Sequence, residues 1–140
     1  MRILIFVLIL INSLGCQGTS LKLPNVSEEQ FTPKYSEIKS LRTRYLMSKD
    51  FIINHKRLIE LEKQALSLAE DEPLKLGAIG TAILDTYYGS LTGHYALTKF
   101  YQYVGSSEAN LHSAWLRTIE NYISKKADGS EEKPIAAISA

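Results

Sequence analysis

The sequence LKLGAIGTAILDTYY occupies residues 74–88 and carries only two charged side chains, Lys75 and Asp85. Leucine and isoleucine recur through it at helical spacing, with glycine and alanine between them. A helix that is apolar on most of its sides is buried, and small residues let its neighbours approach closely. Gly77 and Gly80 each cost about 1 kcal/mol relative to alanine in a helix interior, which contact with another backbone would offset. We therefore expect this segment to be the central and most buried helix.

Two amphipathic segments precede this helix. Thr32 and Pro33 are typical of a helix start, because threonine caps the N-terminus and proline fits the first helical position. The apolar spacing that follows predicts a helix over residues 34–47. Asp50 is the expected cap of a second helix that continues to Ala69 and is held mainly by packing. Its charged side chains, which we place among the polar positions, are Lys56, Arg57, Glu60, Glu62 and Lys63. The sequence Asp71-Glu72-Pro73 then predicts a turn.

Two further helices are expected after the central one. Ser90 is a cap for a helix over residues 91–104, and Gly105 begins a short reversal. The last helix runs over residues 108–125, where apolar side chains again recur on one side. The sequence thus predicts an all-α domain over residues 32–126, with about five helices in antiparallel hairpins.

Length and composition limit the remaining choices. A chain of 140 residues has room for one compact domain, and its hydrophobic fraction of 45% can supply a core. Sixteen basic and fifteen acidic side chains nearly cancel, so no bulk charge attracts nucleic acid. One cysteine and three histidines cannot fill the usual structural zinc sites.

The N-terminus has the pattern of an export signal. Arg2 precedes an unbroken apolar run over residues 3–11, which is far shorter than the roughly 20 residues that cross a bilayer. Small Gly15 then stands directly before Cys16. This pattern resembles the lipobox of bacterial lipoproteins, with residues 1–15 as a cleaved signal helix.

The resemblance to lipoproteins implies a location and an anchor. It implies that Cys16 receives acyl chains such as palmitate, so that the chain contacts the membrane through an N-terminal lipid. Gln17 favours the outer membrane, facing the periplasm. Residues 16–31 then form a flexible tether. The alternative is an ordinary secretory signal, cut near Gly15 or Gly18, that leaves a soluble periplasmic protein.

The helical part also resembles known families. Leu97, Tyr101 and Gly105 fall at the spacing of a tetratricopeptide-type hairpin, and residues 58–88 are the candidate for a second such unit. The chain from Tyr35 onward is similar to a bacterial family of uncharacterised domains. That family has a glycine-containing turn and a short apolar strand, matched here within residues 127–140, a polar turn and short apolar tail.

Motifs of the common enzyme classes are not found, so we expect no catalytic residues, no cofactor and no enzymatic activity. His94 and His112 are weak candidates for a metal site, because they flank Gly105 on helices that should lie antiparallel, with Glu108 and Asp85 nearby. The alternative is that both histidines are exposed or capping residues.

Tyrosines offer a second kind of site. Tyr87, Tyr88, Tyr95 and Tyr103 could line an aromatic groove for a partner, or they could fill the core and its rim. Trp115, Phe100 and Tyr101 are expected in the core. The sequence therefore favours a lipid-anchored helical scaffold that binds another envelope protein. The alternative function is a small metal- or ligand-binding periplasmic accessory protein centred on His94 and His112.

Overall fold

The computed structural model describes residues 31–125, and this range contains helices and no strand. The helices are α1 (Tyr35–Leu46), α2 (Phe51–Leu68), α3 (Leu76–Thr86), α4 (Leu91–Tyr103) and α5 (Glu108–Ser124). The predicted all-α fold with five helices is confirmed. The expected signal, the expected lipidation site Cys16, nearly all of the expected tether and the C-terminal tail lie outside the described residues.

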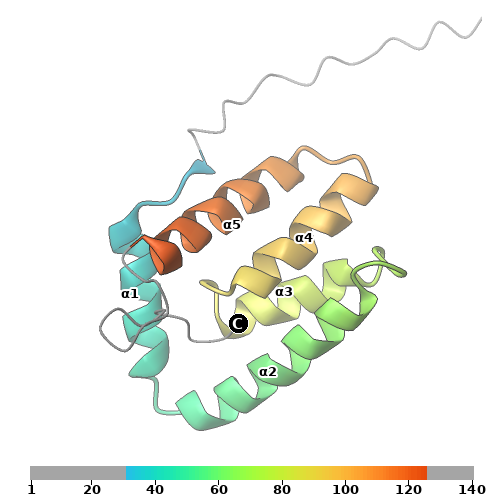
Figure 1. Ribbon diagram of the computed structural model, residues 1–140. Helices are drawn as coiled ribbons and strands as arrows, with labels where there is room; N and C mark the ends of the chain where they lie inside the picture. Colours follow the sequence, from blue (N-terminus) through green and yellow to red (C-terminus); the bar gives the residue numbers. More distant parts are fainter. Residues whose placement is uncertain (1–30, 126–140) are drawn as a thin grey trace, which may run out of the picture.

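The helices form an antiparallel stack that α1 closes at one end. In Figure 1, α2, α3, α4 and α5 run alternately from left to right and back. The middle of the stack belongs to α4, which contacts α3, α5 and also α2. At the left of the same view, α1 lies across the end of the stack and contacts α5. The first and last helices of the described range are therefore neighbours.

Glycines make the interface between α3 and α4 close. A Cβ atom added at Gly77 would lie 2.9 Å from the ring of Phe100, and one added at Gly80 would lie 2.8 Å from Cγ of Leu97. On α4, Gly93 leaves equivalent room for side chains of α3. The expectation of a close helix contact is confirmed, although side chains of α4 rather than its backbone fill the space. The expectation that this segment is the central and most buried helix was wrong. The centre is held by α4, which lies between α3 and α5, whereas α3 exposes Ala78, Thr81 and Asp85 on one side.

The helix starts were predicted with mixed success. Ser90 is the N-cap of α4, and its hydroxyl accepts a hydrogen bond from the Gly93 amide at 3.1 Å, as expected. The start of α1 was predicted wrongly: Lys34 is its N-cap and has extended backbone (φ −80°, ψ 148°), so Pro33 stands outside the helix. Asp50 holds the N-cap position of α2, but within residues 31–125 its side chain makes no capping hydrogen bond.

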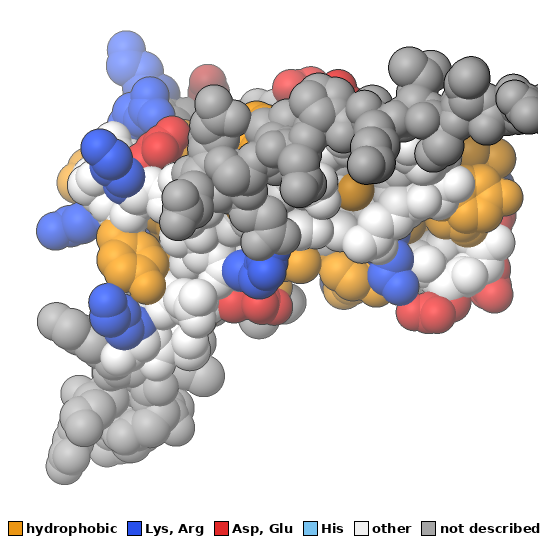
Figure 2. Space-filling model, turned by 90° about the horizontal axis from the view of Figure 1, so that it is seen from above, with side chains coloured by type: hydrophobic (Ala, Val, Ile, Leu, Met, Phe, Trp, Pro, Cys, Tyr) orange, Lys and Arg blue, Asp and Glu red, His pale blue; other side chains and the backbone are white. Residues whose placement is uncertain are grey.

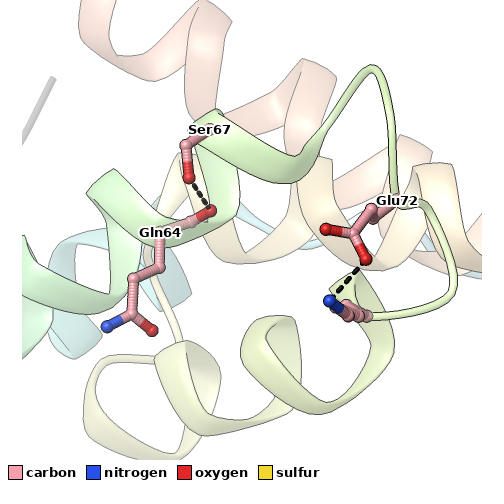
Figure 3. Close-up of polar contacts among 4 residues, drawn as sticks. Gln64, Ser67 and Glu72 are labelled. Atoms are coloured by element: carbon pink, nitrogen blue, oxygen red, sulfur yellow. Dashed lines mark hydrogen bonds and ion pairs between the residues drawn. The ribbon is translucent and has the colours of Figure 1, made fainter.

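The turns between the later helices lie where the sequence predicts them. Gly105 has a positive φ of 71°, a conformation that glycine adopts without strain, and it separates α4 from α5. The turn between α2 and α3 falls where Pro73 predicted it. There an exposed ion pair joins Glu72 to Lys75, and the Ser67 hydroxyl donates to the Gln64 carbonyl at 2.8 Å (Figure 3). An exposed pair of this kind adds at most about 1 kcal/mol, so the turn depends on backbone geometry.

The core has two parts. The larger part fills the space between α2, α3 and α4 and includes one residue of α1; its buried members are Tyr45, Leu58, Ala65, Ala69, Leu76, Ile83, Tyr87 and Ala96. The smaller part joins α1 to α5 through Ile38, Trp115 and Ile119. On the face that is uppermost in Figure 1, hydrophobic side chains form separate patches and basic side chains gather toward the α1 end (Figure 2). None of the helices between residues 31 and 125 is long and apolar enough to cross a bilayer.

Candidate binding pocket and buried histidine pair

An open pocket lies where α1, the start of α2 and the loop between α3 and α4 meet. Its volume is about 280 Å³, and its lining residues are Leu41, Arg44, Tyr45, Ser48, Asn54, Thr86, Tyr87 and Tyr88. The volume is close to the lower end of the range for small-molecule sites, which begins at roughly 300 Å³. The pocket therefore has room for one polar side chain, one chain end or a small ligand.

Two stacked tyrosines form the buried side of this pocket. The rings of Tyr45 and Tyr87 lie 4.5 Å apart at 23°, and both residues are buried. Burial raises the pKa of Tyr87 to about 12 and also raises the pKa of Tyr45. Both hydroxyls therefore keep their protons at neutral pH and can donate hydrogen bonds.

The Tyr45 hydroxyl is a buried donor without a partner. Tyr45 is 6% exposed, and no atom within residues 31–125 accepts a hydrogen bond from its hydroxyl. Ser48 Oγ, which also lines the pocket, is buried and unsatisfied in the same part of the chain. Each such group costs roughly 1–3 kcal/mol unless something pairs with it. Both residues line the pocket, but the two hydroxyl oxygens themselves are buried and have no partner within residues 31–125.

The lining of the pocket carries one positive charge. Among its eight lining residues, Arg44 alone is charged. Two charged groups outside the lining also act on Tyr87: Arg42 lowers its pKa and partly opposes the effect of burial, whereas the Glu62 carboxylate raises it, so a cation and an anion both lie within electrostatic reach. A pocket with one cation, several hydroxyls and an amide in its wall favours an anionic or hydrogen-bond-accepting guest.

A buried carboxylate supports the loop that carries the pocket. Glu62 is 5% exposed, and its Oε1 accepts a hydrogen bond from the Ser90 hydroxyl at 2.6 Å. The same hydroxyl caps α4, so Glu62 holds the start of α4 against α2. The placement of Glu62 with the outward polar residues was therefore wrong. Glu62 follows buried Leu58 by four residues and precedes buried Ala65 by three. This helical spacing is the signal that could have placed Glu62 in the core.

The four candidate tyrosines do not share one groove. Tyr87 is buried, and Tyr88, 39% exposed, stands beside it on the rim of the pocket. Tyr95 is half-buried against the larger core, with the Lys99 ammonium 5.7 Å from its ring. Tyr103 is 62% exposed at the last residue of α4, roughly 18 Å along that helix from its first residue. Two of the four therefore belong to the pocket, and the other two lie elsewhere.

The three aromatic residues expected in the core are buried to different degrees. Trp115 is buried in the smaller core. Phe100 is partly buried and packs against the larger core, while Tyr101 is half-buried beside His112. The core assignment is thus confirmed most fully for Trp115.

The two candidate histidines meet inside the protein. His94 Nδ1 lies 3.0 Å from His112 Nδ1, and both residues are buried, so the alternative of exposed or capping residues was wrong. His94 Nε2 lies 2.9 Å from the Tyr88 carbonyl oxygen, which can only accept. Nε2 of His94 must therefore carry a proton, and in the neutral ring Nδ1 accepts from Nδ1–H of His112.

Burial keeps this pair neutral. It lowers the pKa of His94 to about 3 and lowers the pKa of His112, while Glu108 acts on His112 in the opposite direction. The rings also stack: His94 lies 5.1 Å from Trp115 at 9°, and His112 lies 5.5 Å from Tyr101 at 5°. The pair is thus a hydrogen-bonded link from α5 through α4 to Tyr88 on the pocket rim.

This geometry suits a structural link better than a metal site. The mutual hydrogen bond occupies both Nδ1 atoms, and His94 Nε2 is also engaged. Asp85 is exposed, and nowhere between residues 31 and 125 do three histidine, cysteine or acidic side chains form a group that could hold a metal. A metal at His94 and His112 would have to break the bond between them.

In comparisons with known proteins, no family model, no curated protein and no solved structure matches the chain. Residues 31–125 define an all-α domain of five helices with a polar pocket where α1 and α2 meet. The resemblances to tetratricopeptide hairpins, to a bacterial domain family and to lipoproteins stay predictions.

Proposed function

We propose that the chain is a lipid-anchored protein of the bacterial cell envelope, and that its helical domain binds a carboxylate-bearing segment of another envelope protein. The anchor is Cys16, which follows an apolar run and a small residue as in lipoproteins. The binding site is the pocket between α1, α2 and the α3–α4 loop. The observation that carries the proposal is the pocket lining, in which Arg44 is the one charged residue and stands with Tyr45 and Ser48, whose buried hydroxyls have no partner within residues 31–125.

The pocket wall supports the choice of a carboxylate. Arg44 supplies the positive charge, and Tyr45 and Ser48, whose buried hydroxyls lack a partner in the described part of the chain, line the same pocket. A carboxylate accepts several hydrogen bonds at once, and bonds to it are stronger than bonds between neutral groups. The exposed ring of Tyr88 at the rim offers an apolar surface to the residues beside that carboxylate. One pocket of this size takes an acidic side chain or a chain end, so the partner is held mainly at one point.

Crosslinking in living cells tests the site. A photoreactive phenylalanine analogue replaces Tyr88 in one strain and Tyr103 in another, because both positions are exposed but lie at different ends of α4. We expect a discrete crosslinked envelope protein from position 88 and none from position 103. Arg44→Ala should abolish this product, whereas Lys39→Ala, an exposed cation elsewhere on α1, should leave it intact. Equal crosslinking from both positions, or no effect of Arg44→Ala, would refute the proposed site.

Two further measurements separate the parts of the proposal. A peptide copying the crosslinked segment should compete for the site, and the same peptide with its carboxylates converted to amides should not. Labelled palmitate should be incorporated into the wild-type chain and not into a Cys16→Ala variant. A protein that takes up no palmitate and stays in the cytosol contradicts the anchor, whatever the pocket binds.

A further inference from the structure

The corner between α1 and α2 exposes an unusual amount of apolar surface. Met47 and Ile52 are each 81% exposed and Ile53 is 71% exposed, and Leu46 beside them is exposed as well. In Figure 1 this corner is the lowest part of the described fold, away from α4 and α5. Single exposed apolar residues are ordinary, but four within eight positions of one turn form a patch that calls for a partner.

Basic residues surround this corner. Residues 44–57 contain four basic side chains, Arg44, Lys49, Lys56 and Arg57, and one acidic side chain, Asp50. The segment therefore carries a formal charge of +3 with His55 neutral, although the whole chain carries only +1. Exposed apolar side chains surrounded by basic ones complement a surface that is anionic on its outside and apolar beneath.

The apolar surface continues along the outer side of α2. Ile52, Ile59 and Leu66 recur every seven residues and are all exposed, while Lys56 and Lys63 stand between them. Residues spaced by three and four positions share one side of a helix, so these five side chains form a single row. A basic and apolar row of this kind is typical of a helix that lies in the plane of a bilayer.

We propose that the α1–α2 corner docks on an anionic lipid surface, with Met47, Ile52 and Ile53 entering the headgroup region and the row on α2 lying against it. This contact is distinct from the acyl anchor at Cys16, because it is made by folded residues of the helical domain. A bilayer accepts protruding apolar side chains without a matching cavity, which suits a convex corner. One acyl signal together with a basic patch holds a protein on a membrane far better than either does alone.

A fluorescent probe at the corner tests this contact without help from the lipid anchor. In the full chain with Cys16→Ala, which has no other cysteine, Ile53→Cys is labelled with an environment-sensitive dye. A matched chain carries the dye at Leu74→Cys, an exposed position in the turn at the other end of α2. With vesicles that contain phosphatidylserine or phosphatidylglycerol, we expect a blue shift at position 53 and none at position 74. Vesicles of phosphatidylcholine alone should give a much smaller shift at position 53.

Charge variants give a quantitative prediction. Lys56→Gln should weaken binding to the anionic vesicles about fivefold, the effect of one basic residue near such a surface. Lys39→Gln, which removes an exposed charge from α1, should leave binding unchanged. No shift at position 53, equal shifts at positions 53 and 74, or equal effects of the two lysine variants would overturn the proposal. A shift at position 53 that grows with protein concentration in the absence of vesicles would overturn it in favour of a second copy of the chain.

Discussion

Acid should destabilise this protein at pH values where most carboxylates are still ionised, because His94 is buried in its neutral form. The pKa of His94 falls from 6.5 to about 3 on folding. The unfolded chain therefore takes up a proton below pH 6.5 that the folded chain refuses until about pH 3. The stability contributed by neutral His94 is fully present above pH 6.5 and is lost progressively between pH 6.5 and pH 3.

The size of this loss follows from the difference in pKa. Each pH unit within the window is worth about 1.4 kcal/mol for one proton, so His94 alone removes about 2 kcal/mol between pH 7 and pH 5. His112 acts in the same direction because burial lowers its pKa as well, and Glu108 beside it reduces that contribution. The other rings that face the pair, Tyr88, Tyr101 and Trp115, do not ionise in this range.

Denaturant unfolding followed by circular dichroism measures this effect between pH 7 and pH 5. His94→Gln removes the titration while keeping an amide that can bond to the Tyr88 carbonyl. The variant will be less stable at pH 7, so the informative quantity is the slope of the unfolding free energy with pH. We expect the wild-type slope to exceed that of the variant by about 1 kcal/mol per pH unit on average. Equal slopes would refute the argument that a neutral, buried His94 links stability to pH.

Three further predictions concern the core and the histidine pair. Gly80→Val should cost about 1–3 kcal/mol in unfolding free energy, because its Cβ would meet Leu97. The control, Ala78→Val on the exposed side of α3, should cost less, and equal melting temperatures of the two variants would contradict the close contact. Glu62→Ala should lower the unfolding free energy by about 1–3 kcal/mol, because it leaves the buried Ser90 hydroxyl without its acceptor. The control, Glu60→Ala at an exposed position, should change the unfolding midpoint little, and a reversal of this order would disprove the inward role of Glu62. Purified protein should contain no stoichiometric zinc, copper or iron by elemental analysis, and a chelator should not alter its melting temperature. If the protein held one metal per chain and His112→Ala removed it, the metal-site hypothesis would be supported instead.

Helical spacing was a good guide to where the helices lie. Residues 74–88 contain a helix as predicted, although α3 spans only Leu76–Thr86 and exposes Ala78, Thr81 and Asp85. The helix was predictable because aliphatic side chains recur there at helical intervals. Its burial was overestimated because such spacing does not show which helix has the most neighbours. The N-cap of α1 was assigned wrongly because Thr32 and Pro33 satisfy a local rule, whereas the extended backbone of Lys34 makes Lys34 the cap, two residues later.

The candidate site was harder to derive because it depends on contacts between distant segments. Antiparallel helices placed His94 near His112 correctly, but their burial follows from the packing of Trp115 and Tyr101 around them. The pocket joins residues of α1 and α2 to Tyr87 and Tyr88, and no local pattern predicts that arrangement. The unsatisfied hydroxyl of Tyr45 is visible only once every neighbouring atom has a position.

The contact between α1 and α5 affects how the domain can assemble. A chain emerges from a ribosome, or passes through a membrane channel, with its N-terminal part first. The buried partners of Ile38 are Trp115 and Ile119, which follow more than seventy residues later. The hairpins of α2 to α5 can pair in order as they appear, and Tyr45 of α1 can join the larger core before α5 exists. The smaller core, by contrast, forms only when the whole helical part of the chain is present.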